Sequence, residues 1–112
     1  MNDKKLYISC LYDYYGALLS EKQQYAVEMY YNDDLSLAEI AESIGITRQG
    51  VRDQLKHAEA FLVSCEEKLG FYKKLQKALE LSENIKQLTT ESQDSRGQSI
   101  FAMSSDISEL LS

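Results

Sequence analysis

The residues of this chain best suited to recognition chemistry lie in one short segment, between residues 47 and 56. At 3.6 residues per turn, Val51 and Leu55 lie on one face of a helix, which leaves polar side chains on the opposite face. Amide and guanidinium groups of this kind can contact the base edges and phosphates of DNA. The candidate nucleic-acid-binding residues are Thr47, Arg48, Gln49, Arg52, Asp53 and Lys56.

The functional group of each candidate indicates its role. Gln49 and Arg52 suit base edges. The phosphate candidates are Thr47, Arg48, Lys56 and, as a secondary phosphate contact, Lys22. Asp53 lies at the centre of the exposed face, where it repels phosphate unless it accepts a hydrogen bond from cytosine. The alternative interpretation is that the basic members form only a solvated charged face.

Two short helices and a tight turn must position these residues. Ser36 and Thr47 are suitable N-caps, and Glu39 stands where it completes a capping box with Ser36. Gly45 adopts a left-handed conformation without steric penalty and so can end the first helix. The apolar residues in register to hold the pair together are Ile40, Ala41, Ile46, Val51, Leu55, Ala58 and Leu62.

This pattern predicts a helix-turn-helix over residues 36–58. The second helix of such a unit usually enters the major groove of DNA. The same geometry also occurs in proteins that do not bind DNA, so the shape alone does not establish the ligand.

The whole chain is predicted to be all-α. It has no proline, and its apolar residues recur at steps of three and four. The expected helices cover about 4–19, 21–31, 37–44, 48–69 and 71–88, so that a long fourth helix is followed by a C-terminal one. The predicted organisation is a helical helix-turn-helix domain at 1–88, a flexible polar linker at 89–99, and a tail at 100–112 that forms a short amphipathic helix.

The composition argues against DNA as the ligand. The chain has 112 residues, with 18 acidic against 12 basic residues and a net charge of −6. Counted by thirds, residues 1–35 carry −3, 36–70 carry −2 and 71–112 carry −1, so no third is basic. Nucleic-acid binders usually show a basic footprint, because counterion release drives their affinity.

The remaining chemistry-bearing residues suggest neither an enzyme nor a metal site. Cys10 and Cys65 lie far apart on apolar helical stripes and are expected to be small buried hydrophobes. His57, the only histidine, has no carboxylate or cysteine partner in sequence, and no phosphate loop or nucleophile elbow is present. We therefore expect no enzyme activity and no cofactor. Without a signal peptide or membrane span, a cytoplasmic location is expected.

Tyrosines crowd the first third of the chain and allow two interpretations. They could form a stacking surface for single-stranded nucleic acid. The commoner alternative is that they fill a core and place their hydroxyls at its edge. The tyrosines in question are Tyr7, Tyr12, Tyr14, Tyr15, Tyr25, Tyr30 and Tyr31.

A heptad pattern on the fourth helix favours a homodimer. Apolar residues from Leu55 to Tyr72 step by three and four, and the preceding helices look too short to cover them all. The dimer-interface candidates are Leu62, Cys65, Leu69, Tyr72 and Leu79. The alternative is that the fifth helix folds back over this seam within one chain, with Gly70 as the bend.

Four stretches, at residues 11–15, 18–23, 30–42 and 47–53, resemble the YlxM family of small bacterial helix-turn-helix proteins. The resemblance covers about residues 4–80. The helix-turn-helix is also similar to region 4 of bacterial sigma factors, where the matching helix reads promoter DNA. That similarity implies base-facing roles for Arg48, Gln49, Arg52, Asp53 and Lys56.

The resemblance implies two functions. One is a DNA-binding regulator. The other is an interaction module of the signal recognition particle pathway, with the particle's protein or RNA as partner, because the family is encoded beside the particle's GTPase genes. This chain departs from the expected pattern at Gly50, where alanine is expected, and at His57, where a basic residue is expected.

Overall fold

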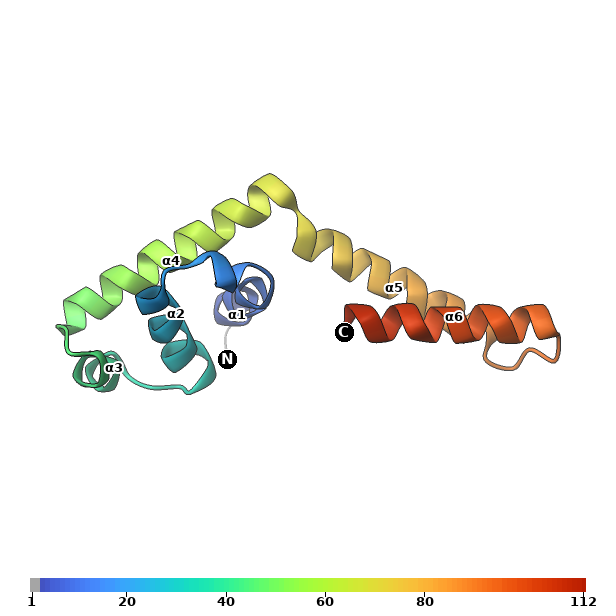
Figure 1. Ribbon diagram of the computed structural model, residues 1–112, viewed down its shortest axis with the longest axis horizontal. Helices are drawn as coiled ribbons and strands as arrows, with labels where there is room; N and C mark the ends of the chain where they lie inside the picture. Colours follow the sequence, from blue (N-terminus) through green and yellow to red (C-terminus); the bar gives the residue numbers. More distant parts are fainter. Residues whose placement is uncertain (1–2) are drawn as a thin grey trace. The chain divides into compact units, whose positions relative to one another are not determined.

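A computed structural model describes residues 3–112, and every regular element in that range is helical (Figure 1). This confirms the predicted all-α class. The chain divides between Gly70 and Phe71 into two compact units. The first contains α1 (Asp3–Tyr15), η1 (Gly16–Leu18), α2 (Glu21–Val27), η2 (Glu28–Asn32), α3 (Leu37–Ile44) and α4 (Arg48–Leu69), and the second contains α5 (Phe71–Thr89) and α6 (Ser95–Leu111).

In the first unit, α1, α2 and α3 all pack against the long helix α4 (Figure 1). Leu62 is fully buried in this core, so its predicted place in a dimer interface is wrong. Leu62 is covered within its own chain, which the heptad pattern could not reveal because it does not identify the partner. The fully or nearly fully buried side chains include Ile8, Leu11, Tyr15, Ala26, Val27, Ile40, Val51 and Ala58.

The helix boundaries around the predicted turn follow from capping. The Ser36 hydroxyl accepts from the backbone N–H of Glu39, and the Glu39 carboxylate accepts from that of Ser36. At the other end of α3, Gly45 has φ 74° in the left-handed region. The Thr47 hydroxyl then accepts from the backbone N–H of Gly50 and begins α4. The predicted turn chemistry is confirmed.

Replacing Gly45 by alanine is expected to lower the free energy of unfolding by about 1–2 kcal/mol, because an L-residue is strained at this φ. A Cβ at Gly45 would meet no atom within 4 Å, so the cost is backbone strain alone. Chemical denaturation measures it. Gly45→Asn is the control and should lose less, since asparagine tolerates this conformation; equal stability of wild type and Gly45→Ala would contradict the account.

The second helix departs from the expected regular form. After α2 ends at Val27, a π-helical turn continues over Glu28–Asn32. Asp34 follows with φ 54°, the one described non-glycine residue with a positive φ. The helical segment ends at Asn32, close to the predicted end at residue 31.

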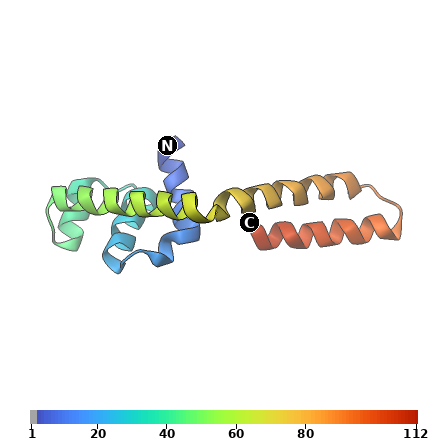
Figure 2. The same cartoon turned by 90° about the horizontal axis from the view of Figure 1, so that it is seen from above.

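The second unit is a hairpin in which α5 and α6 run antiparallel (Figure 2). The predicted linker at 89–99 and tail helix at 100–112 therefore need correction, because α5 ends at Thr89 and α6 already begins at Ser95. The Asp94 carboxylate accepts from the backbone N–H of Arg96 and starts α6. The connection also passes close to Gly97, where an added Cβ would lie 1.9 Å from the Ser92 hydroxyl oxygen. The domain boundary likewise falls at Gly70 rather than after residue 88.

Candidate nucleic-acid interface

The candidate interface is the amino-terminal half of α4, directly after the turn that ends α3. The structure leaves the side chains of all six candidates on α4 exposed, while Val51 and Leu55 on the opposite side are buried. The exposed residues are Thr47, Arg48, Gln49, Arg52, Asp53 and Lys56. The turn and the N-cap thus present a polar helix face to solvent.

Two candidates on this face are already paired with each other. The Gln49 side-chain amide donates to the Asp53 carboxylate over 3.0 Å. The pair spans one helical turn, so it holds the Gln49 amide in place on the exposed face. Its remaining N–H and its carbonyl oxygen stay available to a ligand, and the Asp53 carboxylate is partly satisfied by a donor of its own chain.

Thr47 acts first as a cap. Its hydroxyl oxygen accepts from the Gly50 N–H over 2.9 Å, while its hydroxyl hydrogen can still be donated to a phosphate. An added Cβ at Gly50 would lie 3.2 Å from that oxygen and 3.3 Å from the Ile46 Cδ1 atom. Gly50 therefore fits the close packing at the corner, which accounts for a glycine in the first turn of a helix.

The basic candidates divide between two flanks of α4. Arg52 and Lys56 line one shallow pocket together with Tyr30, Leu37, Leu55 and Glu59. Lys22 instead lines a pocket with Gln54, together with Tyr25, Ile44 and Ile46. Because Arg52 and Gln54 lie almost half a turn apart around the helix, Lys22 is not continuous with the Arg52–Lys56 flank.

Glu59, the carboxylate that lines the same pocket as Arg52 and Lys56, is bound by groups of its own chain. The Tyr31 hydroxyl donates to Glu59, and the Lys4 ammonium lies 3.8 Å from the same carboxylate group. Sequence reasoning missed this role for Glu59. A signal was present, because Glu59 and Glu66 are seven residues apart and therefore share one side of α4. The Tyr15 hydroxyl donates to Glu66 over 2.7 Å.

Of the seven tyrosines, Tyr15 and Tyr31 follow the core interpretation, whereas Tyr7 and Tyr25 are exposed and the other three are half-buried. Tyr15 and Tyr31 are 2% and 5% exposed, with hydroxyls at the edge of the core. Burial, and then the hydrogen bond to Glu59, raise the pKa of Tyr31 well above its usual value. Burial and the hydrogen bond to Glu28 do the same to the pKa of Tyr12.

Replacing Tyr31 by phenylalanine is expected to lower the free energy of unfolding by about 1–3 kcal/mol at neutral pH, because Glu59 loses its donor. The raised pKa also predicts alkaline destabilisation. The neutral phenol stabilises the fold below the unfolded pKa of about 10, and this contribution is lost as the pH rises through the folded pKa. Urea denaturation at pH 8 to 11 checks both effects. The exposed Tyr25→Phe is the control, and equal pH profiles for wild type and Tyr31→Phe would oppose the assignment.

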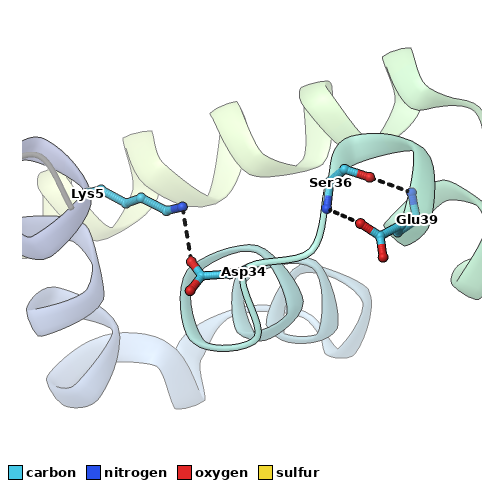
Figure 3. Close-up of polar contacts among 4 residues, drawn as sticks. All are labelled: Lys5, Asp34, Ser36 and Glu39. Atoms are coloured by element: carbon cyan, nitrogen blue, oxygen red, sulfur yellow. Dashed lines mark hydrogen bonds and ion pairs between the residues drawn. The ribbon is translucent and has the colours of Figure 1, made fainter.

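A lysine of α1 contacts the segment that precedes α3. The Lys5 ammonium lies 3.5 Å from the Asp34 carboxylate, and Figure 3 shows this pair beside the Ser36–Glu39 capping box. The same ammonium lies 4.4 Å from the centre of the Tyr30 ring. The backbone and side-chain hydrogen bonds to Ser36 lower the pKa of Glu39. The first helix of the helix-turn-helix is thereby held at its amino end.

The histidine, cysteine and acidic side chains of the described residues do not gather into a metal site. Among residues 3–112, no group of three His, Cys, Asp or Glu side chains could hold a metal ion. Cys10 and Cys65 are free and half-buried. None of the helices in the same range is sufficiently long and apolar to span a membrane.

Comparison with known proteins places this geometry in a family. Residues 2–100 match the UPF0122 family model, described as "Putative helix-turn-helix protein, YlxM / p13 like". The chain belongs to this family. A UPF0122 protein of Caldanaerobacter subterraneus subsp. tengcongensis is 52% identical over 87 residues, which cover 78% of this chain and 74% of the relative. A UPF0122 protein of Oceanobacillus iheyensis is 45% identical over 91 residues, 81% of this chain and 87% of the relative.

The family match confirms the resemblance seen in the sequence. It includes all of α3 and α4, and therefore the whole candidate interface. It also extends through α5 and into the first part of α6, beyond the helix-turn-helix itself. The family description supports a helix-turn-helix protein and names no ligand.

Proposed function

We propose that this UPF0122 protein is a regulatory protein that binds double-stranded DNA through the exposed face of α4. The observation that carries the proposal is the exposure of all six polar candidates on one capped helix that follows a tight turn. A helix held in this way can enter the major groove, where Arg52 and Gln49 reach base edges. Such a role implies a cytoplasmic location.

The exposed face of α4 carries a charge opposite in sign to the net charge of −6 of the whole chain. Glu59 pairs with Tyr31 and Lys4, Glu66 accepts from Tyr15, and Glu39 closes a capping box. These carboxylates interact with groups of their own chain. On the face of α4 itself the charges are Arg48, Arg52 and Lys56 against Asp53.

Selection from a pool of randomised duplexes at low salt tests the proposal directly. The protein is expected to enrich one sequence motif, and fluorescence anisotropy should show log Kd rising with log salt as phosphate contacts are lost. A scrambled duplex of equal length is the control. The absence of any enriched motif, together with no anisotropy change at about 50 mM salt, where phosphate contacts are strongest, would overturn the proposal.

A second candidate function is binding to the protein or RNA of the signal recognition particle. The observation that favours it is Asp53, which places a carboxylate at the centre of the exposed face, where duplex phosphates would be repelled. Pull-down with the purified particle protein and, separately, with its RNA tests this candidate. If neither the particle protein nor its RNA is retained, this candidate function is contradicted.

We also propose that the active form is a homodimer. A single helix-turn-helix with three or four phosphate contacts binds DNA with an affinity of about 10⁻⁴–10⁻⁶ M at physiological salt. Two copies on adjacent half-sites would bind far more tightly. Of the predicted interface residues other than Leu62, Leu69 is 43% exposed, while the side chains of Cys65, Tyr72 and Leu79 are half-buried.

A further inference from the structure

The contact between α5 and α6 is made in part by small polar side chains. Ser82, Ser104 and Ser108 are the buried polar residues of the hairpin, at 3%, 3% and 7% exposed. The Ser82 hydroxyl donates to the Ser104 carbonyl over 2.7 Å and lies 2.9 Å from the Ser108 hydroxyl. These small side chains allow the two helices to approach closely. Most of the large apolar residues of α5 and α6 lie outside this contact.

The large apolar residues form one exposed stripe on each helix. On α6 they step by three, four and three, and on α5 they step by four and three, so each set occupies one helix face. Leu88 and Leu110 are 86% and 85% exposed, which is extreme for leucine. The α6 stripe is Ile100, Met103, Ile107 and Leu110, and the α5 stripe is Leu81, Ile85 and Leu88.

The two stripes lie on the same side of the hairpin. At about 100° per residue, each stripe is centred roughly a quarter turn from the buried serines of its own helix, in the same rotational sense. Because α5 and α6 run antiparallel (Figure 2), equal rotation on both helices turns the two stripes toward one side. The seven side chains therefore form one continuous apolar face, which we call the hairpin face.

We propose that the hairpin face binds the hairpin face of a second copy of this chain, so that α5 and α6 of two copies form a four-helix bundle. The seven exposed side chains offer an apolar area on the order of 800 Å² per copy, which is what a standard interface takes from each partner. An exposed apolar patch of this size marks an interaction site.

The charges of the hairpin also favour a second copy. Helix α5 carries four lysines against two glutamates, and α6 carries one arginine against two acidic residues. A bundle in which α5 faces α6 of the other copy brings opposite net charges together. One self-complementary surface then satisfies both copies, as a two-fold axis requires.

The small size of the second unit also favours binding of a second copy. The second unit comprises only residues 71–112, and a chain of this length rarely forms a sufficient core without a disulfide, a metal or an oligomer. The serine contacts between its helices add little apolar burial, whereas a second layer over the hairpin face would bury the seven large side chains.

Sedimentation equilibrium of the full chain without DNA tests the proposal. Wild type is expected to have twice the mass of the chain at micromolar concentration, and Ile107→Glu to weaken the dimer at least about 100-fold, because a carboxylate would be buried unpaired. The matched control is Gln98→Glu, which adds the same charge to α6 on the opposite side of the hairpin. It should dimerise like wild type.

A mixture separates lost dimerisation from lost folding. Ile107→Glu and Leu81→Lys copies should each be monomeric, and together they should restore a dimer, because α6 of one copy faces α5 of the other and the opposite charges then meet at the interface. A monomeric wild type, a fully dimeric Ile107→Glu, a monomeric Gln98→Glu or the absence of rescue on mixing would overturn the proposal. Because no DNA is present, these results do not depend on the proposed DNA-binding function.

Discussion

Replacing Arg52 and Lys56 together by alanine is expected to weaken DNA binding roughly 10- to 100-fold at about 0.1 M salt. Both side chains are exposed and line the same flank of α4, so their loss removes contacts to the ligand rather than to the core. The slope of log Kd against log salt should fall by about 0.9 for each lost phosphate contact. Fluorescence anisotropy over a salt series measures both quantities.

A second double variant controls for net charge. Lys68→Ala with Lys73→Ala removes two exposed positive charges that lie outside the candidate interface and off the stripe of the hairpin face. It should leave the affinity and the salt slope close to wild type. Equal losses in both double variants would mean that overall charge, and not the face of α4, determines binding. The thermal stability of the Arg52/Lys56 variant should match wild type within about 0.5 kcal/mol.

Replacing Leu62 by alanine is expected to lower the free energy of unfolding of the first unit by about 2–5 kcal/mol. Leu62 is 0% exposed, so the truncation leaves a cavity in the core of the first unit that the neighbouring side chains fill only in part. Urea denaturation measures the loss.

The matched control is Leu69→Ala on the same helix and the same heptad seam. Leu69 is 43% exposed, and its truncation should cost less than about 1 kcal/mol. Similar losses at both positions would contradict the placement of Leu62 in the core. The comparison also decides between the core and the dimer interpretation of the seam, because a core residue changes stability at every protein concentration.

The helix-turn-helix was predictable because its signals are local. Ser36, Gly45 and Thr47 determine where α3 ends and α4 begins, through contacts within four residues in the sequence. The exposure of the α4 candidates followed from helical periodicity alone. The predicted caps are present in the structure: Ser36 forms the capping box with Glu39, and Thr47 caps α4.

The roles of the tyrosines and of Leu62 depend on long-range contacts and could not be predicted in this way. Tyr15 and Glu66 are 51 residues apart in the sequence, and Tyr31 and Glu59 are 28 apart. A periodic pattern shows that Leu62 faces a partner, but it does not distinguish a helix of the same chain from a second copy.

The hairpin was mispredicted because its helices meet through serines. A polar stretch without large apolar groups indicates a linker when read alone. Asp94 nevertheless begins α6 within that stretch, and Ser104 and Ser108 accept a buried place because Ser82 contacts both of them. In this hairpin the serines are buried and hydrogen-bonded while large apolar residues are exposed, which is the reverse of the usual distribution of polar and apolar side chains.

The most direct test of the central claim is a titration of the isotope-labelled chain with a selected duplex, followed by NMR. The account predicts that the largest backbone amide shifts occur between residues 47 and 56. Smaller shifts are expected near Lys22 of α2, which lies beside Gln54 on the other flank of α4. Amide shifts confined to α5 and α6, or absent at a duplex concentration that saturates binding by anisotropy, would contradict DNA recognition by α4.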